Sequence, residues 1–114
     1  MPLTVHDKDV LILAALADPI RLRIVTRLSQ GQEIAGVELA KDLRISRALL
    51  CHHAGILVKA GVASRRKEGQ LGYLRLNAAR LQRCVTKLMV SLPSRRRTAH
   101  PPGVAAVSVR RGMK

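Results

Sequence analysis

The chain has 114 residues, enough for one small domain, and 47% of them are apolar, so a hydrophobic core is feasible. Tyr73 is its only aromatic residue, which excludes binding of bases by a series of stacked rings. Because no apolar run approaches the length of a membrane span and two cysteines provide no disulfide framework, we expect a cytoplasmic protein without signal peptide or membrane contact.

The net charge of +14 is distributed unevenly along the chain. Residues 1–43 carry five Lys/Arg and six Asp/Glu, residues 44–92 carry ten and one, and residues 93–114 carry six and none. Basic charge concentrated in one part of a small chain indicates a polyanionic partner. We therefore expect a nucleic acid to contact mainly the second half of the chain.

Three helices are predicted before the basic region. Residues 6–16 are apolar nearly all round, so this helix needs cover on more than one side, and a partner subunit is the expected second cover. Asp18 and Pro19 are typical of a helix start, and Gly31 ends that second helix. The third helix covers about residues 36–43. The second helix also carries three arginines that we expect to be solvated: Arg21, Arg23 and Arg27.

Residues 46–76 predict a helix followed directly by a β-hairpin. Ser46 is a typical N-cap, and Gly61 can take the left-handed conformation that closes a helix. Two strand-like runs follow, 62–67 and 71–76, joined by a three-residue connection around Gly69. With the third helix before it, this order predicts a winged helix-turn-helix, in which the helix enters the major groove and the hairpin lies along the neighbouring backbone.

A final helix is predicted after the hairpin, with Asn77 as its N-cap. Its apolar residues recur at helical spacing and form a stripe, which favours a two-fold interface between the first and last helices of two copies. We expect this homodimer interface to include Leu11, Leu13, Leu81, Cys84, Val85, Leu88 and Met89. The predicted fold is mainly α, with about five helices and a two-stranded wing in residues 1–92, and residues 93–114 form a basic, Pro/Arg-rich tail that we expect to be disordered.

The expected partner is double-stranded DNA. Arg47 is the best candidate to read a base, because a guanidinium can bond guanine at two atoms in the major groove. Ser46 and the helix N-terminus suit a phosphate. The complete predicted DNA-contacting set is Ser46, Arg47, Ala48, Cys51 and His52 on the helix, and Arg65, Arg66, Lys67 and Gln70 in the wing.

The two cysteines differ in their predicted surroundings. Cys51 follows Arg47 by one helical turn and precedes His52, and a positive neighbourhood favours the reactive thiolate, so Cys51 is a possible thiol sensor. The alternative is a small side chain that only fills space. Cys84 lies on the apolar stripe of the last helix and is expected in the core or the interface.

The segments ALADPIRLRIVTRL, GVELAKDLRIS and HHAGILVKAGVASRRKEGQLGYLRL resemble the ArsR/SmtB family of bacterial winged-helix repressors over about residues 10–90. The resemblance implies a dimeric repressor that binds a palindromic operator and is released by a metal ion, a redox change or another signal. It also implies positions for metal ligands, but those positions hold Ala35, Gly36 and Val37 near the third helix, and the last helix offers only Asn77, Gln82 and Cys84. We therefore predict no metal site and no cofactor.

No catalytic constellation or phosphate-binding glycine loop is present in the sequence, so we do not expect an enzyme. Two alternatives to a sequence-specific regulator stay open. One is a nucleic-acid-binding protein without sequence preference, and the other is a protein-interaction adaptor that uses the same fold without DNA.

Overall fold

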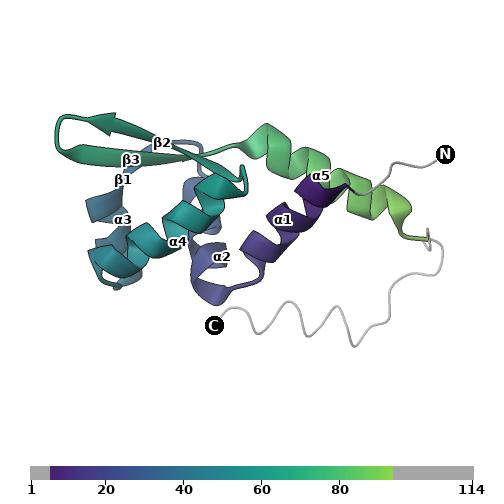
Figure 1. Cartoon of the computed structure of the whole chain (residues 1–114), viewed down its shortest axis with the longest axis horizontal. Helices are drawn as coiled ribbons and strands as arrows, with labels where there is room; N and C mark the ends of the chain where they lie inside the picture. The colour runs from purple at the N-terminus through teal and green to yellow at the C-terminus, as the bar shows by residue number, and fades with distance from the viewer. Residues whose placement is uncertain (1–5, 94–114) are drawn as a thin grey trace.

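Five helices and three strands make up residues 6–93, the part of the chain that this computed structural model describes (Figure 1). Apart from Pro93, the predicted basic tail lies outside the described residues. None of the described helices is long and apolar enough to cross a membrane. The helices are α1 (Asp7–Leu16), α2 (Pro19–Leu28), α3 (Gly36–Leu43), α4 (Arg47–Lys59) and α5 (Ala78–Ser91).

The strands form one antiparallel sheet in the order β1-β3-β2. They are β1 (Ile34–Ala35), β2 (Ala63–Glu68) and β3 (Leu71–Leu76). The predicted two-stranded wing is confirmed as β2 and β3, but the sequence did not predict β1, because two residues are too few for an alternating pattern to be visible. The predicted three-residue connection is also one residue too long: Glu68 pairs with Leu71, which leaves only Gly69 and Gln70 in the turn.

The predicted helix starts at Asp18 and Ser46 are confirmed. The Asp18 carboxylate accepts hydrogen bonds from the backbone N–H groups of Ile20 and Arg21, at 2.9 and 3.0 Å. The Ser46 hydroxyl accepts one from the Leu49 N–H at 3.0 Å. Each cap satisfies backbone donors that have no partner inside the helix.

The side chain of Asn77 does not cap α5, although Asn77 does occupy the N-cap position. Its Nδ2 donates to the Gly61 carbonyl at 2.9 Å, and its Oδ1 accepts from the Ser64 hydroxyl at 2.8 Å. These two bonds hold the residue after β3 against the residues that follow α4. The Asn77 amide thereby fixes the base of the hairpin. The φ of +84° at Gly61 confirms the predicted left-handed residue after α4.

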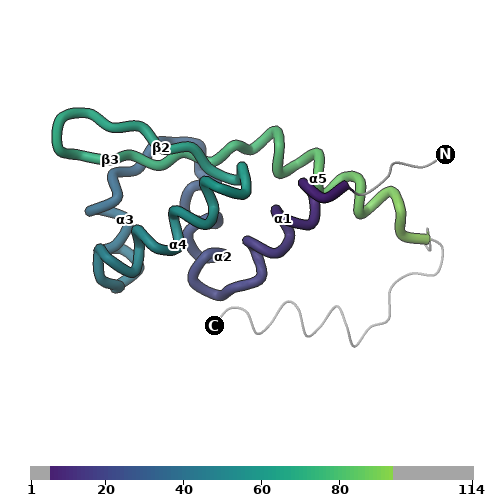
Figure 2. The backbone as a smooth tube through the Cα atoms, in the orientation of Figure 1, coloured from purple at the N-terminus to yellow at the C-terminus, as the bar shows by residue number. Residues whose placement is uncertain are grey.

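The core lies where the helices and the base of the sheet meet, and it is aliphatic. α2 contributes Ile24 and Leu28, which are fully buried. α4 contributes Leu57, and Val62 is buried where the chain leaves that helix. The hairpin extends from this core, with α3 and α4 below it (Figures 1 and 2). The sheet and the core thereby fix how the wing sits relative to α4.

α1 and α5 lie side by side at the end of the molecule opposite the hairpin turn (Figure 2). Asp9 of α1 is buried, and its carboxylate pairs with the Lys87 ammonium at 3.0 Å. The Cys84 thiol is also buried and lies 3.8 Å from the Asp9 carbonyl oxygen. Cys84 therefore packs in the core of the protomer, one of its two predicted places, and we remove it from the predicted dimer-interface residues.

Candidate nucleic-acid interface

The turn between α3 and α4 sets the direction of α4. Arg44 takes the left-handed conformation at φ 59°, and the Ile45 N–H then donates to the Ala40 carbonyl at 3.0 Å. Arg23 of α2 reaches this turn and donates to the Leu43 carbonyl at 3.0 Å. The carbonyl groups at the end of α3 thus have partners from two directions. Three residues separate α3 from α4, so the two helices form a helix-turn-helix.

One side of α4 packs on the core and the other faces solvent. Its buried residues are Leu50, His53, Ala54 and Leu57. The predicted DNA-contacting residues of this helix are all exposed: Ser46, Arg47, Ala48, Cys51 and His52. The structure therefore leaves them available to a partner.

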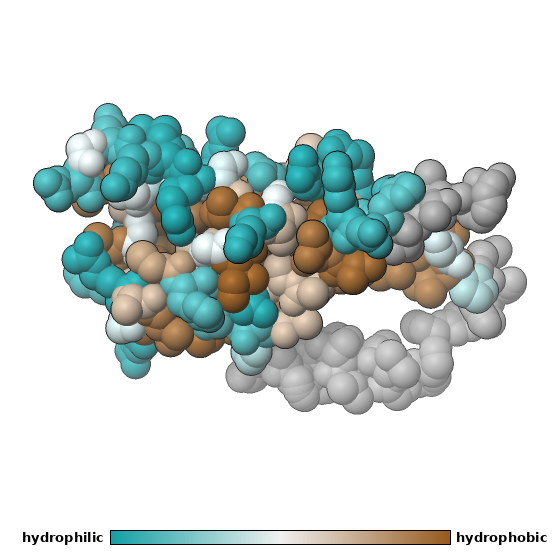
Figure 3. Space-filling model, viewed as in Figure 1, coloured by the Kyte–Doolittle hydropathy of each residue, from teal (hydrophilic) through white to brown (hydrophobic). Residues whose placement is uncertain are grey.

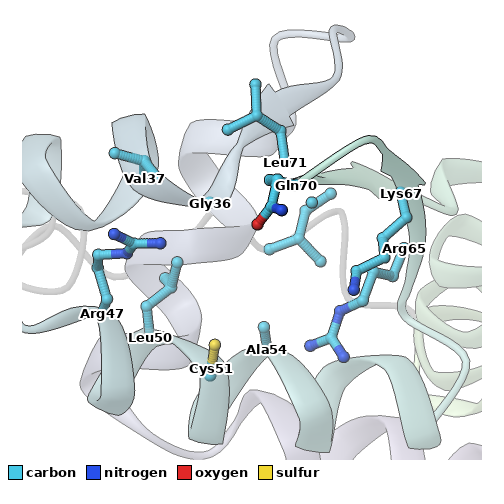
Figure 4. A pocket seen from close by; sticks show the side chains of 12 residues that line it. Gly36, Val37, Arg47, Leu50, Cys51, Ala54, Arg65, Lys67, Gln70 and Leu71 are labelled. Atoms are coloured by element: carbon cyan, nitrogen blue, oxygen red, sulfur yellow. The ribbon is translucent and has the colours of Figure 1, made fainter.

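A groove of about 330 Å³ lies between α4 and the wing (Figure 4). Arg47 and Cys51 border it from α4, and Arg65 and Lys67 border it from β2 (Figure 4). Gln70 in the turn lines it as well, with its amide directed inward. The structure thus brings together five of the predicted residues from two segments of the chain.

Arg66 points to the other side of the hairpin. Its guanidinium pairs with Glu33 at 2.8 Å and Glu68 at 3.1 Å, and lies 4.8 Å from the centre of the Tyr73 ring. The hydrogen bond from Arg66 lowers the pKa of the Glu33 carboxyl, and the two carboxylates raise the pKa of Arg66. Since alternation directs Arg65 and Lys67 to the groove, it directs Arg66 away, and we remove Arg66 from the predicted DNA contacts.

We expected the three arginines of α2 to be solvated. Arg23 is exposed and Arg21 and Arg27 are partly exposed, and each also has a partner within the protein. Arg21 donates from Nε to the Ala15 carbonyl at 2.6 Å. Arg27 pairs with Asp42 at 2.9 Å, and the bond from Arg23 to Leu43 completes the set. These contacts join α2 to α1 and α3. The sequence held no signal for them, since their partners lie up to 20 residues away.

Arg21 of α2 also contacts His53, a buried residue of α4. This histidine is 8% exposed, and its Nδ1 lies 3.1 Å from Nη1 of Arg21. Because a guanidinium only donates, the imidazole accepts at Nδ1 in this arrangement. The position of His53 on the buried side of α4 is thus explained by packing and a hydrogen bond, and His52 is the histidine that faces solvent.

The two cysteines differ as the sequence indicated. Both are free; Cys51 is exposed beside the groove, and Cys84 is buried between α1 and α5. Burial, followed by the charge of Asp9, raises the pKa of the Cys84 thiol, so this thiol stays protonated. Only Cys51 is accessible to reagents.

No cluster of three or more His, Cys, Asp or Glu side chains that could hold a metal ion exists within residues 6–93. Ala35 ends β1, and Gly36 and Val37 begin α3. These three residues offer no ligand side chain at the position that the resemblance associates with metal binding.

The comparisons with known proteins agree with this geometry, although no family model matches the chain. The chain is 37% identical to the transcriptional repressor SdpR of Bacillus subtilis over 71 residues, which are 62% of this chain and 78% of SdpR. Its fold matches HlyU from Vibrio cholerae with a TM-score of 0.62 and 30% identity, over 71% of this chain and 87% of HlyU. An ArsR-like transcriptional regulator from Rhodococcus sp. RHA1 matches with a TM-score of 0.63 and 28% identity, over 72% of this chain and 76% of that regulator. The helix-turn-helix, the basic wing and these relatives together show that the chain belongs to the ArsR/SmtB family of winged-helix, DNA-binding transcriptional regulators.

Proposed function

We propose that this protein is a homodimeric repressor that binds a short palindromic DNA operator and has no enzymatic activity. The observation that carries the proposal is the position of Arg47, Arg65 and Lys67, which converge on one exposed groove from α4 and the wing. The relative SdpR is named a transcriptional repressor, which supports repression as the outcome of binding. We place this activity in the cytoplasm, where the operator would be.

In this proposal α4 lies in the major groove with its N-terminal turn toward the bases. Arg47 reads guanine, while Ala48 and His52 contact neighbouring bases. Ser46 and the first N–H groups of α4 contact a phosphate. Arg65, Lys67 and Gln70 contact the adjacent backbone or a narrowed minor groove and add affinity with less sequence preference.

The dimer in this proposal forms through α1 and α5, which retain exposed apolar side chains. Leu11 is 57% exposed and Met89 is 66% exposed, and Val85 and Leu88 lie on the same helix as Met89. On the face shown in Figure 3, hydrophilic side chains cover the hairpin, whereas apolar ones show along α1 and α5. Leu13 and Leu81 are half-buried against the protomer's own core, so they contribute less than predicted.

Cys51 is the proposed point of control if the inducing signal is a thiol reaction. Its exposed thiol lies on the surface that would face DNA, so an added group there would block docking. Cys84 is too buried to share this role, and no disulfide joins the two. Operator binding measured before and after oxidation, with Cys51→Ser as the comparison, tests this part of the proposal.

The test of the proposed function is selection of a preferred sequence from random DNA, followed by footprinting. We expect one discrete protected palindrome and a sedimentation mass of two copies. Uniform protection at all sequences would instead support a nucleic-acid-binding protein without sequence preference. Absence of DNA binding at low salt would support a protein-interaction adaptor, because phosphate contacts must strengthen as salt falls.

A further inference from the structure

The groove between α4 and the wing has one feature that DNA contact explains and one that it does not. Contact with DNA accounts for the basic side chains at its edge, which would bind phosphates or a base. It does not explain the apolar interior of the groove, where Leu50, Ala54 and Leu74 are buried and form the floor. Val37 and Leu71 line the same groove and are 41% and 42% exposed. A largely apolar hollow with a few polar groups at its edge is typical of a small-molecule site.

The charges that border the groove are all of one sign. Arg47, Arg65 and Lys67 line it, and no Asp or Glu does. Three basic side chains elsewhere in residues 6–93 pair with acids, Arg27, Arg66 and Lys87, but no ion pair between described residues involves the three cations of the groove. They enter from two sides, Arg47 from α4 and the other two from β2 (Figure 4). A ligand that complements this groove is therefore an anion with an apolar body.

We propose that this groove binds a small amphipathic carboxylate, such as a medium-chain fatty acid. Its alkyl chain would lie along Leu74 and Leu71, and its carboxylate would accept hydrogen bonds from Arg65 and Lys67. The volume of about 330 Å³ is near the lower end for ligand sites, so a short chain fits and a long one does not.

Binding of the carboxylate would regulate the DNA-contacting site, and this consequence rests on the proposed function. The ligand would occupy Arg65 and Lys67, which the proposed function assigns to DNA phosphates, so carboxylate and operator would compete. The fatty acid would then act as a releasing signal that requires neither a metal ion nor a thiol.

The first experiment uses the full chain without DNA and titrates it with octanoate, followed by amide chemical shifts in NMR spectra. We expect shifts confined to the residues that line the groove, including Gly36, Cys51 and Gly72. Octyltrimethylammonium has the same tail with the opposite charge and should cause none of them. Butanoate should bind at least about tenfold more weakly, because each buried methylene contributes to affinity.

Matched variants then test the groove itself. Arg65→Gln and Leu71→Asn each change an exposed side chain at its edge, and each should weaken octanoate binding at least about fivefold. Arg83→Gln removes the same charge from exposed α5 and should leave it unchanged. Octanoate shifts spread over the whole basic surface, equal losses in all three variants, or no shifts at all would overturn the proposal.

A second experiment measures operator binding by fluorescence anisotropy with and without octanoate. Displacement of DNA by octanoate, reduced in Leu71→Asn, supports regulation through the groove. If octanoate binds without displacing the operator DNA, the two ligands do not compete and the proposed regulation is wrong. A protein that selects no operator would refute the proposed function, and the NMR titration would still decide whether the carboxylate site exists.

Discussion

Two sets of basic side chains in this protein have opposite surroundings. The arginines of α2 donate to a carbonyl or pair with a carboxylate: Arg21 to Ala15, Arg23 to Leu43 and Arg27 to Asp42. The cations of the groove, Arg47, Arg65 and Lys67, have no ion pair with any described residue. The first set joins helices of the protomer, and the second is left for a partner.

The difference shows why net charge alone locates a partner poorly. The +14 of the chain indicates a polyanion, but part of that charge is used inside the protomer. The same difference occurs within the single strand β2. Arg66 pairs with Glu33, whereas its neighbours Arg65 and Lys67 face the groove. We therefore propose as contact residues the cations that lie on the exposed side of α4 or β2 without an acid beside them.

The largest expected effect comes from neutralising the whole groove set in Arg47→Gln, Arg65→Gln and Lys67→Gln together. We expect operator affinity to fall at least about a hundredfold, because a base contact and the wing's phosphate contacts are lost together. The slope of log affinity against log salt should shrink by about 4, because the proposed dimer loses two phosphate contacts from each copy. The free energy of unfolding should change little, since all three side chains are exposed. Anisotropy titrations over a salt series and urea unfolding measure the two effects.

The control for this triple variant removes the same charge elsewhere, with Lys8→Gln, Lys59→Gln and Arg83→Gln, which are also exposed. It should keep most of the operator affinity. If it loses as much as the groove variant, the affinity comes from total charge, and the distinction between the two sets does not hold.

Arg21→Ala tests the other set. It removes the bond to Ala15 and the contact with His53, so we expect the free energy of unfolding to fall by about 1–3 kcal/mol, as for hydrogen bonds that involve a charged group. Operator affinity of the folded protein should change far less than in the groove variant. Unchanged unfolding together with lost DNA binding would instead place Arg21 among the contact residues. Urea denaturation at neutral pH makes this measurement.

Gly55→Ala separates the stability of α4 from its contacts. Glycine inside a helix costs up to about 1 kcal/mol relative to alanine, and an added Cβ at Gly55 would meet no atom within 4 Å. We therefore expect the variant to be more stable by up to about 1 kcal/mol in thermal or urea unfolding. Reduced operator affinity in this more stable protein would show that DNA approaches the backbone here. A loss of stability would contradict the open space around Gly55.

The smallest expected effect is the acid dependence of the Asp9–Lys87 pair. The backbone N–H of His6 and then the Lys87 ammonium lower the pKa of the Asp9 carboxyl in the folded protein. A depressed folded pKa gives stability that is complete above the unfolded value of about 4 and is lost as pH falls through the folded pKa. Wild type and Asp9→Asn should therefore differ at neutral pH and converge in acid. Parallel unfolding curves over the whole pH range would exclude this contribution.

Most of the fold could be predicted because its signals are local. The side chains of Asp18 and Ser46 cap helices by accepting hydrogen bonds from backbone N–H groups within three residues of them. The spacing of apolar residues in α2 and α4 likewise indicates which side of each helix is buried. β1 was missed because only its pairing with β3 defines it. Asn77 was assigned the wrong partner because Gly61 and Ser64 reach it only in the folded chain.

The candidate site was predictable to the same extent. Alternation along β2 places Arg65 and Lys67 on one face and Arg66 on the other, but it could not show that Glu33, 33 residues earlier, pairs with Arg66. The apolar groove had no sequence signal either, because Val37, Leu50 and Leu71 come from three elements. Contacts between distant segments decide which cations are free, and periodicity does not contain that information.

The central claim is that Arg47 is free to read a base, and its substitution tests this most directly. Binding of Arg47→Ala should be measured on the selected operator and on random DNA of equal length at one salt concentration. We expect a loss of about 1–3 kcal/mol on the operator and little loss on random DNA. Equal losses on both would show that Arg47 contributes only charge, and would contradict a sequence-reading role for α4.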